Sequence, residues 1–298
     1  MQNNHKRIFQ ASLFVAISGI LYGFLGYLGT SLLRDNISIS TMLFWRFLIA
    51  SSWIFLFTIR KYSVLRAFNA IDTRTLFFTF FLGAIGYAGS SWFYFIASQY
   101  TGTGLAMVIF FSYPIIVALA SWIKNRETIN AVTIFTLIFM MTGLFFLRDS
   151  SAHQFNMIGI FFGIVAAICY AFYVMGSKRI SSITVNSNVL TIMVSLGCAF
   201  IFLMLSISSH SFVFPHSMKS WLYLLALGIL ATALPIQLML EGLKYVSSMR
   251  ASIISVLEPL VTVFVGVLLL NESISYLQIL GVSIILISAL LIQFQREL

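Results

Sequence analysis

Charged side chains are scarce in this sequence. Its 298 residues include 17 lysines and arginines and eight aspartates and glutamates, which together make up 8% of the chain. A soluble domain carries roughly 25% charged residues. So few charges cannot cover a surface that faces water, and the composition therefore excludes an ordinary soluble globular protein.

Cysteine and histidine are also rare, and their positions exclude several kinds of site. The two cysteines, Cys169 and Cys198, fall in apolar runs and provide no disulfide framework. We expect no metal site, no bound cofactor and no serine–histidine catalytic pair at membrane depth, because every histidine lies outside the apolar runs. These histidines are His5, His153, His210 and His216.

Motifs for nucleotide chemistry and for ion channels are absent as well. The chain has no G-x-x-x-x-G-K-[ST] loop, so we expect no ATP hydrolysis. It has no aspartate-rich pair that could hold Mg²⁺ on a diphosphate substrate, and no selectivity-filter loop. The sequence therefore predicts neither an enzyme nor a channel.

Long apolar runs dominate instead. Hydrophobic residues make up 60% of the chain, and the mean hydropathy is +1.01. A helix that crosses a membrane needs about 20 apolar residues. The sequence predicts an all-α membrane protein with ten transmembrane helices, because the runs do not alternate as the strands of a membrane barrel do. The runs are 9–32, 39–59, 75–98, 102–122, 129–148, 157–176, 187–208, 219–241, 248–270 and 275–294.

Lysine and arginine predict the orientation of these helices. With ten spans and an internal N-terminus, the inner segments hold 13 of the 17 basic residues, the outer loops hold three, and Arg46 lies inside the second span. This bias places both termini in the cytoplasm. The basic residues are dispersed over the loops without an aromatic stacking platform, so we expect no nucleic-acid partner.

The second half of the chain repeats the first at a shift of 145 residues. LGAIGYAGSSWFYFIASQY (82–100) then lies over LGILATALPIQLMLEGLKY (227–245), and Pro114 lies over Pro259. Residues 9–148 and 157–294 thus form two repeats of five spans each. Because five is odd, the second repeat has inverted topology, which is typical of secondary transporters with a midplane substrate site.

The same segments resemble a known family. FSYPIIVALASWIKNRE (111–127) and VLEPLVTVFVGVLLLNE (256–272) are similar to the two P-x(n)-E motifs of the EamA branch of the drug/metabolite transporter superfamily, and FWRFLIA (44–50) resembles its Arg-Phe signature. The resemblance covers about residues 12–293. It implies a 5+5 inverted repeat whose cavity is lined mainly by helices one to four and six to nine, with helices five and ten peripheral.

The resemblance also implies a function. We expect a secondary active or facilitative transporter in the bacterial inner membrane, which exports amino acids, related metabolites or drugs by alternating access. Its partners would be a small-molecule substrate and membrane lipid, with protons as a candidate coupling ion. Two alternatives stay open: an uptake transporter for a cofactor-like metabolite, and a membrane enzyme or receptor that binds a lipid or a cofactor.

Two charged residues lie deep in the apolar runs. A charge at the centre of a membrane helix is costly, by about 2.5–3.5 kcal/mol on insertion scales. Arg46 either contacts an anionic group of the substrate or holds carbonyl groups of a neighbouring helix. Glu258 can carry a proton or hold a substrate amine, and its alternative is a permanent ion pair with Arg46.

Prolines predict loosened helices in both repeats. Pro114 follows Tyr113, and Pro259 follows Glu258 at the matched position. A proline removes one backbone hydrogen bond and disfavours helical geometry at the preceding residue. We expect Pro114, Pro259 and Pro235 to act as hinges, and Tyr113 and Glu258 to contact the substrate.

Further candidate substrate contacts come from amide and aromatic side chains in the spans. A buried amide needs hydrogen-bond partners, so we expect Gln237, matched to Trp92 by the repeat, to face the cavity. Tyrosines seven residues apart share a helical face, and others are matched across the repeat. Ordinary packing is the alternative for all the aromatic residues, which are Trp92, Tyr87, Tyr94, Tyr22 and Tyr170.

Overall fold

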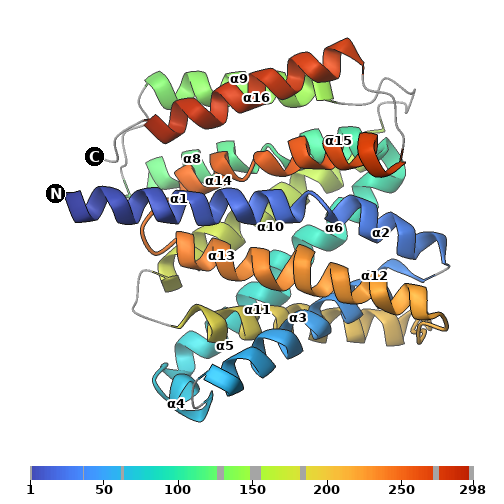
Figure 1. Cartoon of the computed structure of the whole chain (residues 1–298). Coiled ribbons are helices and arrows are strands. Elements are labelled where there is room, and N and C mark those ends of the chain that lie inside the picture. The colour runs from blue at the N-terminus through green and yellow to red at the C-terminus, as the bar shows by residue number, and fades with distance from the viewer. Residues whose placement is uncertain are drawn as a thin grey trace.

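The computed structural model describes residues 2–35, 37–61, 64–125, 131–147, 156–181, 186–270 and 275–294. Within these ranges every regular element is a helix and no strand is present, which confirms the all-α prediction. Most of the helices lie roughly side by side in one bundle (Figure 1). Glu127 and Glu272, which end the two repeated motifs, lie outside the described residues.

The helices follow the predicted runs, and several runs consist of two or three helical pieces. The first repeat contains α1 (Gln2–Tyr22), α2 (Leu25–Arg34), α3 (Ile39–Lys61), α4 (Val64–Asn69), α5 (Thr73–Phe81), the π-helix η1 (Leu82–Tyr87), α6 (Ala88–Thr101), α7 (Thr103–Phe110), α8 (Tyr113–Asn125) and α9 (Ala131–Leu147). The second contains α10 (Met157–Ser181), α11 (Ser187–Ser208), α12 (Met218–Gly228), the π-helix η2 (Ile229–Ala233), α13 (Leu234–Gly242), α14 (Ser248–Ile254), α15 (Leu257–Leu270) and α16 (Tyr276–Phe294).

Eight helical segments of the described chain are long and apolar enough to cross a membrane. They are Lys6–Arg34, Ile39–Arg60, Thr73–Thr101, Leu105–Ile123, Met157–Ser181, Ser187–Ser208, Met218–Gly242 and Ser248–Leu269. Two shorter apolar helices, Ala131–Phe146 and Tyr276–Ser288, occupy the fifth and tenth predicted runs. The chain is therefore a multi-pass integral membrane protein.

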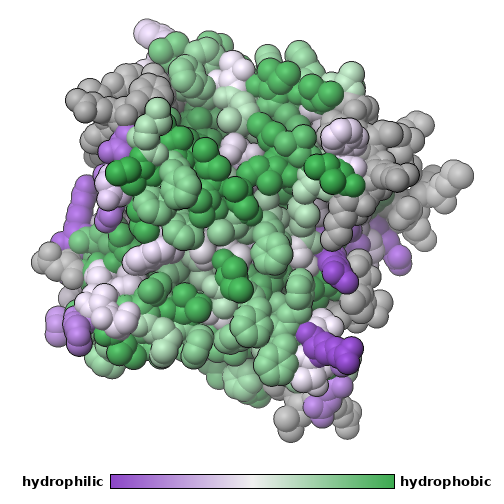
Figure 2. Space-filling view, turned by 180° about the vertical axis from the view of Figure 1, so that it is seen from behind, coloured by the Kyte–Doolittle hydropathy of each residue, from purple (hydrophilic) through white to green (hydrophobic). Residues whose placement is uncertain are grey.

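The outer surface carries the apolar side chains that lipid requires. Phe77, Phe161 and Phe264 are each 62% exposed, and large apolar residues are exposed along most of the long helices. Figure 2 shows a broad hydrophobic face, with hydrophilic side chains gathered mainly near the two edges where the helices end. This distribution matches a hydrocarbon layer around the middle of the bundle.

The two repeats share the same irregularities in their helices. In the third run α5 passes through η1 into α6, and in the eighth run α12 passes through η2 into α13. The fourth run is interrupted by a turn at residues 111–112, and the ninth by a turn at residues 255–256. These features recur within a few residues of the 145-residue shift, so the repeat seen in the sequence extends to the backbone.

Contacts between the repeats follow the symmetry of the repeat. The most extensive helix pairs join one repeat to the other: α3 with α11, α9 with α16, α6 with α10, and α1 with α13. The start of α1 and the end of α16 lie at the same end of the molecule (Figure 1). A cavity at the centre of the bundle is therefore enclosed by helices of both repeats.

One departure from the symmetry lies in the first run. α1 ends at Tyr22 and α2 begins at Leu25, whereas α10 in the matching run is continuous. Gly23 lies so close to α15 that an added Cβ would be 2.5 Å from Cβ of Val261. Thr262 donates a hydrogen bond of 3.2 Å to the carbonyl of Gly23. The broken first run is therefore held directly against α15.

Candidate functional site

A cavity of about 570 Å³ lies between the two repeats. Its wall is built by α2, α6, α7 and α15, and its deep end by Tyr22, Arg46, Tyr87, Tyr170 and Glu258. Its lining extends from Tyr22 at the end of α1 to Thr30 near the end of α2, Ser98 near the end of α6 and Gln278 near the start of α16. The cavity therefore opens toward the end of the molecule where α2 ends and α16 begins.

Glu258 faces this cavity from the first turn of α15. The turn at residues 255–256 starts a new helix there, and the positive end of a helix dipole favours a carboxylate at this position. Among the described residues no hydrogen bond or ion pair to the carboxylate is present, and the ion pair that is present joins Lys244 to Glu241 near the opposite end. In this structure Glu258 therefore forms no direct ion pair with Arg46.

Arg46 of α3 is only 2% exposed, and protein groups hold its guanidinium. Nε donates to the hydroxyl of Thr232 at 2.6 Å, and Nη2 donates to the hydroxyl of Tyr87 at 3.3 Å and to the carbonyl of Ala231 at 3.5 Å. The guanidinium carbon also lies 4.9 Å from the ring centre of Phe47. Arg46 thus joins α3 of the first repeat to η2 of the second.

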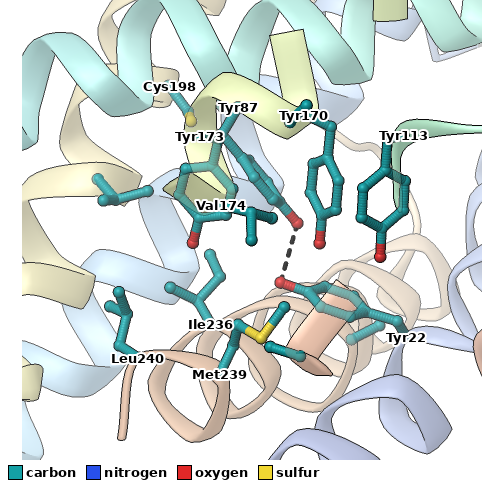
Figure 3. Close-up of a cluster of buried hydrophobic side chains, with 14 of the residues drawn as sticks. Tyr22, Tyr87, Tyr113, Tyr170, Tyr173, Val174, Cys198, Ile236, Met239 and Leu240 are labelled. Atoms are coloured by element: carbon teal, nitrogen blue, oxygen red, sulfur yellow. Dashed lines mark hydrogen bonds between the residues drawn. The ribbon is translucent and has the colours of Figure 1, made fainter. Parts of the chain in front are cut away.

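Five tyrosines form a cluster at the deep end of the cavity (Figure 3). They are Tyr22 of α1, Tyr87 of η1, Tyr113 of α8, and Tyr170 and Tyr173 of α10. The hydroxyl of Tyr87 donates to that of Tyr22 at 3.0 Å, so a chain of hydrogen bonds runs from Arg46 to α1. The ring centres of Tyr113 and Tyr170 are 4.7 Å apart.

Tyr113 packs against Phe110 and Tyr170 of the cavity lining and is itself fully buried. Its hydroxyl donates at 3.2 Å to the carbonyl of Ser252. That carbonyl is available because α14 ends nearby, where the N–H of Val256 donates to Ile253. The bond joins the interrupted fourth run to the interrupted ninth run, and therefore joins one repeat to the other.

A second buried hydrogen bond also joins the two repeats. The hydroxyl of Ser18 in α1 donates at 2.7 Å to the carbonyl of Pro235 in α13. Val15 of α1, Ile236 of α13 and Tyr173 of α10 are all 0% exposed. The half of the molecule beyond the tyrosines is therefore closed, whereas the other half holds the cavity.

Gln237 and Trp92 do not line this cavity. The amide of Gln237 donates to Asn188, whose own amide donates to Thr58 at 3.1 Å, so these residues tie α13 to α11 and α3. Trp92 lines a separate hollow of about 510 Å³ near the end of α2. Phe95 borders both spaces and separates them.

The three prolines lie in the first turns of helices. Pro114 is the second residue of α8, Pro259 the third of α15, and Pro235 the second of α13. The first N–H groups of a helix have no partner within it, so prolines are tolerated at the starts of α8 and α15. α13 continues directly from η2, so Pro235 lies where the π-helix passes into the α-helix. In the fourth and ninth runs the chain turns just before the proline, and a new helix then starts.

Several residues of the site were not among those predicted from the sequence. Thr232 and Ser252 bind Arg46 and Tyr113, and Leu144 of α9 and Gln278 of α16 reach the cavity wall. The fifth and tenth helices, expected to be peripheral, thus contribute to the lining, whereas the seventh and eighth do not. No feature of the sequence distinguished Thr232, because threonine occurs in most of the predicted spans.

This combination defines the class of protein. Apolar helices in two repeated halves enclose a central cavity that carries an acidic and a basic residue, which is the architecture of secondary transporters. The chain belongs to the EamA-like transporter family, whose model matches residues 10–148 and again residues 157–294. The family lies within the drug/metabolite transporter superfamily that the sequence motifs indicated.

Individual relatives agree with this assignment. An uncharacterized transporter of Bacillus subtilis (strain 168), YcbK, is 28% identical over 200 residues, which cover 63% of this chain and 62% of that protein. An uncharacterized transporter of Archaeoglobus fulgidus is 28% identical over 198 residues, which cover 66% of this chain and 70% of that protein. The match thus spans less than two thirds of the Bacillus protein. Both names denote transporters, which are not a class of enzyme.

A solved structure shares the fold. A crystal structure of another protein superposes with a TM-score of 0.80 at 19% identity, and the match covers 94% of this chain and 95% of that chain. At this identity the likeness concerns the fold alone.

Proposed function

We propose that the protein is a secondary active or facilitative transporter that moves small organic metabolites by alternating access. One observation carries the proposal: the cavity between the repeats opens at one end and is closed at the other by buried contacts between the same repeats. Because the two repeats are related in structure, a small rotation of one against the other can exchange the open end for the closed end.

The proposed topology has ten transmembrane helices in two inverted repeats, 9–148 and 157–294, with both termini in the cytoplasm of a bacterial cell. The bias of 13 internal to three external basic residues supports it. In this orientation the cavity faces the outside. Export of amino acids, related metabolites or drugs follows from the family resemblance, and protons are the candidate coupling ion.

The proposed substrate contacts are the predicted residues that line the cavity. These are Glu258, Arg46, Tyr22, Tyr87, Tyr94 and Tyr170. Tyr113 does not line the cavity, and it is proposed to act through its hydrogen bond to Ser252. The turns before Pro114 and Pro259 are proposed hinges. Pro235 is proposed as a third hinge next to η2.

Transport by purified protein in liposomes tests the proposal. Liposomes that contain the protein should accumulate or release a labelled metabolite faster than protein-free liposomes, and unlabelled metabolite on the opposite face should accelerate the exchange. A panel of amino acids, amines and organic acids covers the expected substrates. Binding or chemical conversion of a compound without net movement across the bilayer would contradict the proposed function.

A further inference from the structure

We propose that the cavity selects organic cations: small molecules with one protonated or quaternary amine and an aromatic or similarly apolar body. This inference rests on the proposed function, because it names the class of substrate that the same cavity would carry. It is drawn from the chemistry of four features, namely a free carboxylate, an occupied guanidinium, a wall of rings and the volume they enclose.

The free carboxylate is that of Glu258. It faces the cavity from the first turn of α15, and among the described residues no hydrogen bond or direct ion pair reaches it, so the positive charge of Arg46 attracts it only at longer range. An isolated charge removed from water is costly unless an opposite charge accompanies it. A ligand that brings a cation into the cavity supplies that missing partner.

The occupied guanidinium is that of Arg46. It already donates to Thr232, Tyr87 and the carbonyl of Ala231, and Tyr87 in turn donates to Tyr22. Arg46 is 2% exposed, whereas Glu258 is half-buried and open to the cavity. A ligand entering from the open end therefore meets the negative charge more readily than the positive one, which disfavours anions.

The wall of rings runs from the open half to the deep end. Tyr94 lies 5.5 Å from Phe110, Phe110 lies 5.2 Å from Tyr170, and Tyr170 lies 5.9 Å from Tyr87, measured between ring centres. Aromatic faces attract ammonium groups and also provide apolar contact area. The same ring faces repel a carboxylate, so they favour the cationic end of a ligand over the second charge of a zwitterion.

The volume agrees with such a ligand. About 570 Å³ falls inside the range of about 300–1,000 Å³ that is typical of small-molecule pockets. A benzene ring with a short aminoalkyl chain fits this space, with its amine at Glu258 and its ring against Phe110.

Four probes that share a phenylethyl-type body but differ in charge separate the effect of charge on binding from the effect of shape. They are phenethylamine, which is protonated at neutral pH, the zwitterion phenylalanine, the neutral 2-phenylethanol and the anion 3-phenylpropionate. Calorimetric titration of the full-length protein in nanodiscs should show phenethylamine binding at least about tenfold tighter than each of the other three. Equal or tighter binding of phenylalanine or 3-phenylpropionate would overturn the proposal.

Glu258→Gln tests the role of the carboxylate. Affinity for phenethylamine should fall about 10- to 100-fold, to the level of 2-phenylethanol, whose own affinity should stay unchanged. Glu241→Gln is the matched control, because it removes a carboxylate that is paired with Lys244 away from the cavity, and it should bind as the parent does. Glu258→Asp keeps the charge and should keep the preference for the amine, which provides the test should Glu258→Gln fail to fold. A Glu258→Gln protein that binds phenethylamine as the parent does would overturn the assignment.

Flux of the same probes in liposomes separates this inference from the proposed function. Tight binding of phenethylamine without flux of any probe would support the ligand class and contradict transport. Flux of 3-phenylpropionate or phenylalanine, with phenethylamine neither bound nor carried, would support transport and overturn the ligand class.

Discussion

At the scale of single residues, Arg46 shows how a buried charge can be structural. Three of its contacts go to protein groups, and two of these lie on η2, which belongs to the other repeat. The π-helix places Thr232 so that its hydroxyl accepts from Arg46 and donates to the carbonyl of Leu227 at 2.7 Å. The guanidinium therefore contributes to the packing of the two repeats.

We predict that Arg46→Ala lowers the stability of the protein more than it changes its selectivity. Removal of the guanidinium leaves Thr232, Tyr87 and the Ala231 carbonyl without a donor, and each hydrogen bond to a charged group contributes about 1.5–3 kcal/mol. The expected result is a lower yield of folded protein and a clear drop in melting temperature in detergent.

Lys219→Ala is the control for Arg46→Ala, because Lys219 is an exposed basic residue at the start of α12. It should melt close to the parent, as most surface substitutions do. An Arg46→Ala protein that melts normally but no longer accepts an anionic substrate would show that Arg46 is a binding residue.

Sequence reasoning singled out both deep charges but could resolve only part of their roles. Arg46 and Glu258 stood out because charges in apolar runs are rare, and both reach the cavity. Gln237 was expected to face the cavity, but its partner Asn188 lies on α11, 49 residues away in the chain. A contact between residues so far apart in the chain depends on how the helices pack. The residue pattern within one helix does not predict that packing.

At the scale of elements, the interrupted helices determine where the closed half begins. The turn at residues 255–256 frees the carbonyl of Ser252, and the turn at residues 111–112 precedes Tyr113. The proline signal predicted loosened helices at these places, and the structure shows complete turns followed by new helices. The π-helices were not predicted, because η1 contains no proline and its sequence LGAIGY carries no distinctive pattern.

We predict that Tyr113→Phe weakens the closed half without unfolding it. The hydroxyl makes one bond, to the Ser252 carbonyl, and a single hydrogen bond contributes about 0.5–1.5 kcal/mol, which corresponds to a shift of roughly two- to tenfold in a two-state equilibrium. A cysteine introduced at Ser177, which is buried beyond the tyrosines, should then react two- to tenfold faster with a soluble thiol reagent.

Ser195→Ala is the matched control for Tyr113→Phe. It removes a buried hydroxyl that has no hydrogen-bond partner among the described residues, so it should leave the reaction rate at the introduced cysteine unchanged. A Tyr113→Phe protein with the parent's rate at that cysteine would show that the Tyr113–Ser252 bond does not hold the closed half together.

At the scale of the whole molecule, the sequence predicted the helices and the repeat, but it did not predict which end of the cavity is open. The apolar runs predicted the helices, and the matched segments at a shift of 145 residues predicted the repeat that the π-helices and turns now show. Which end of the cavity is open depends on a small difference between two packings of the same helices, and a small free-energy difference between two states leaves no pattern in the sequence.

The central claim is that the two ends of the cavity open in turn, and the accessibility of Ser91 tests it most directly. Ser91 lies on α6, half-buried in the cavity wall. A Ser91→Cys protein, with Cys169 and Cys198 replaced by alanine, is treated in membrane vesicles of known orientation with an impermeant thiol reagent. The account predicts labelling from both faces, faster from the face to which the cavity opens, and none in the cysteine-free parent. Labelling from one face alone, however long the exposure, would show a fixed pocket and contradict alternating access.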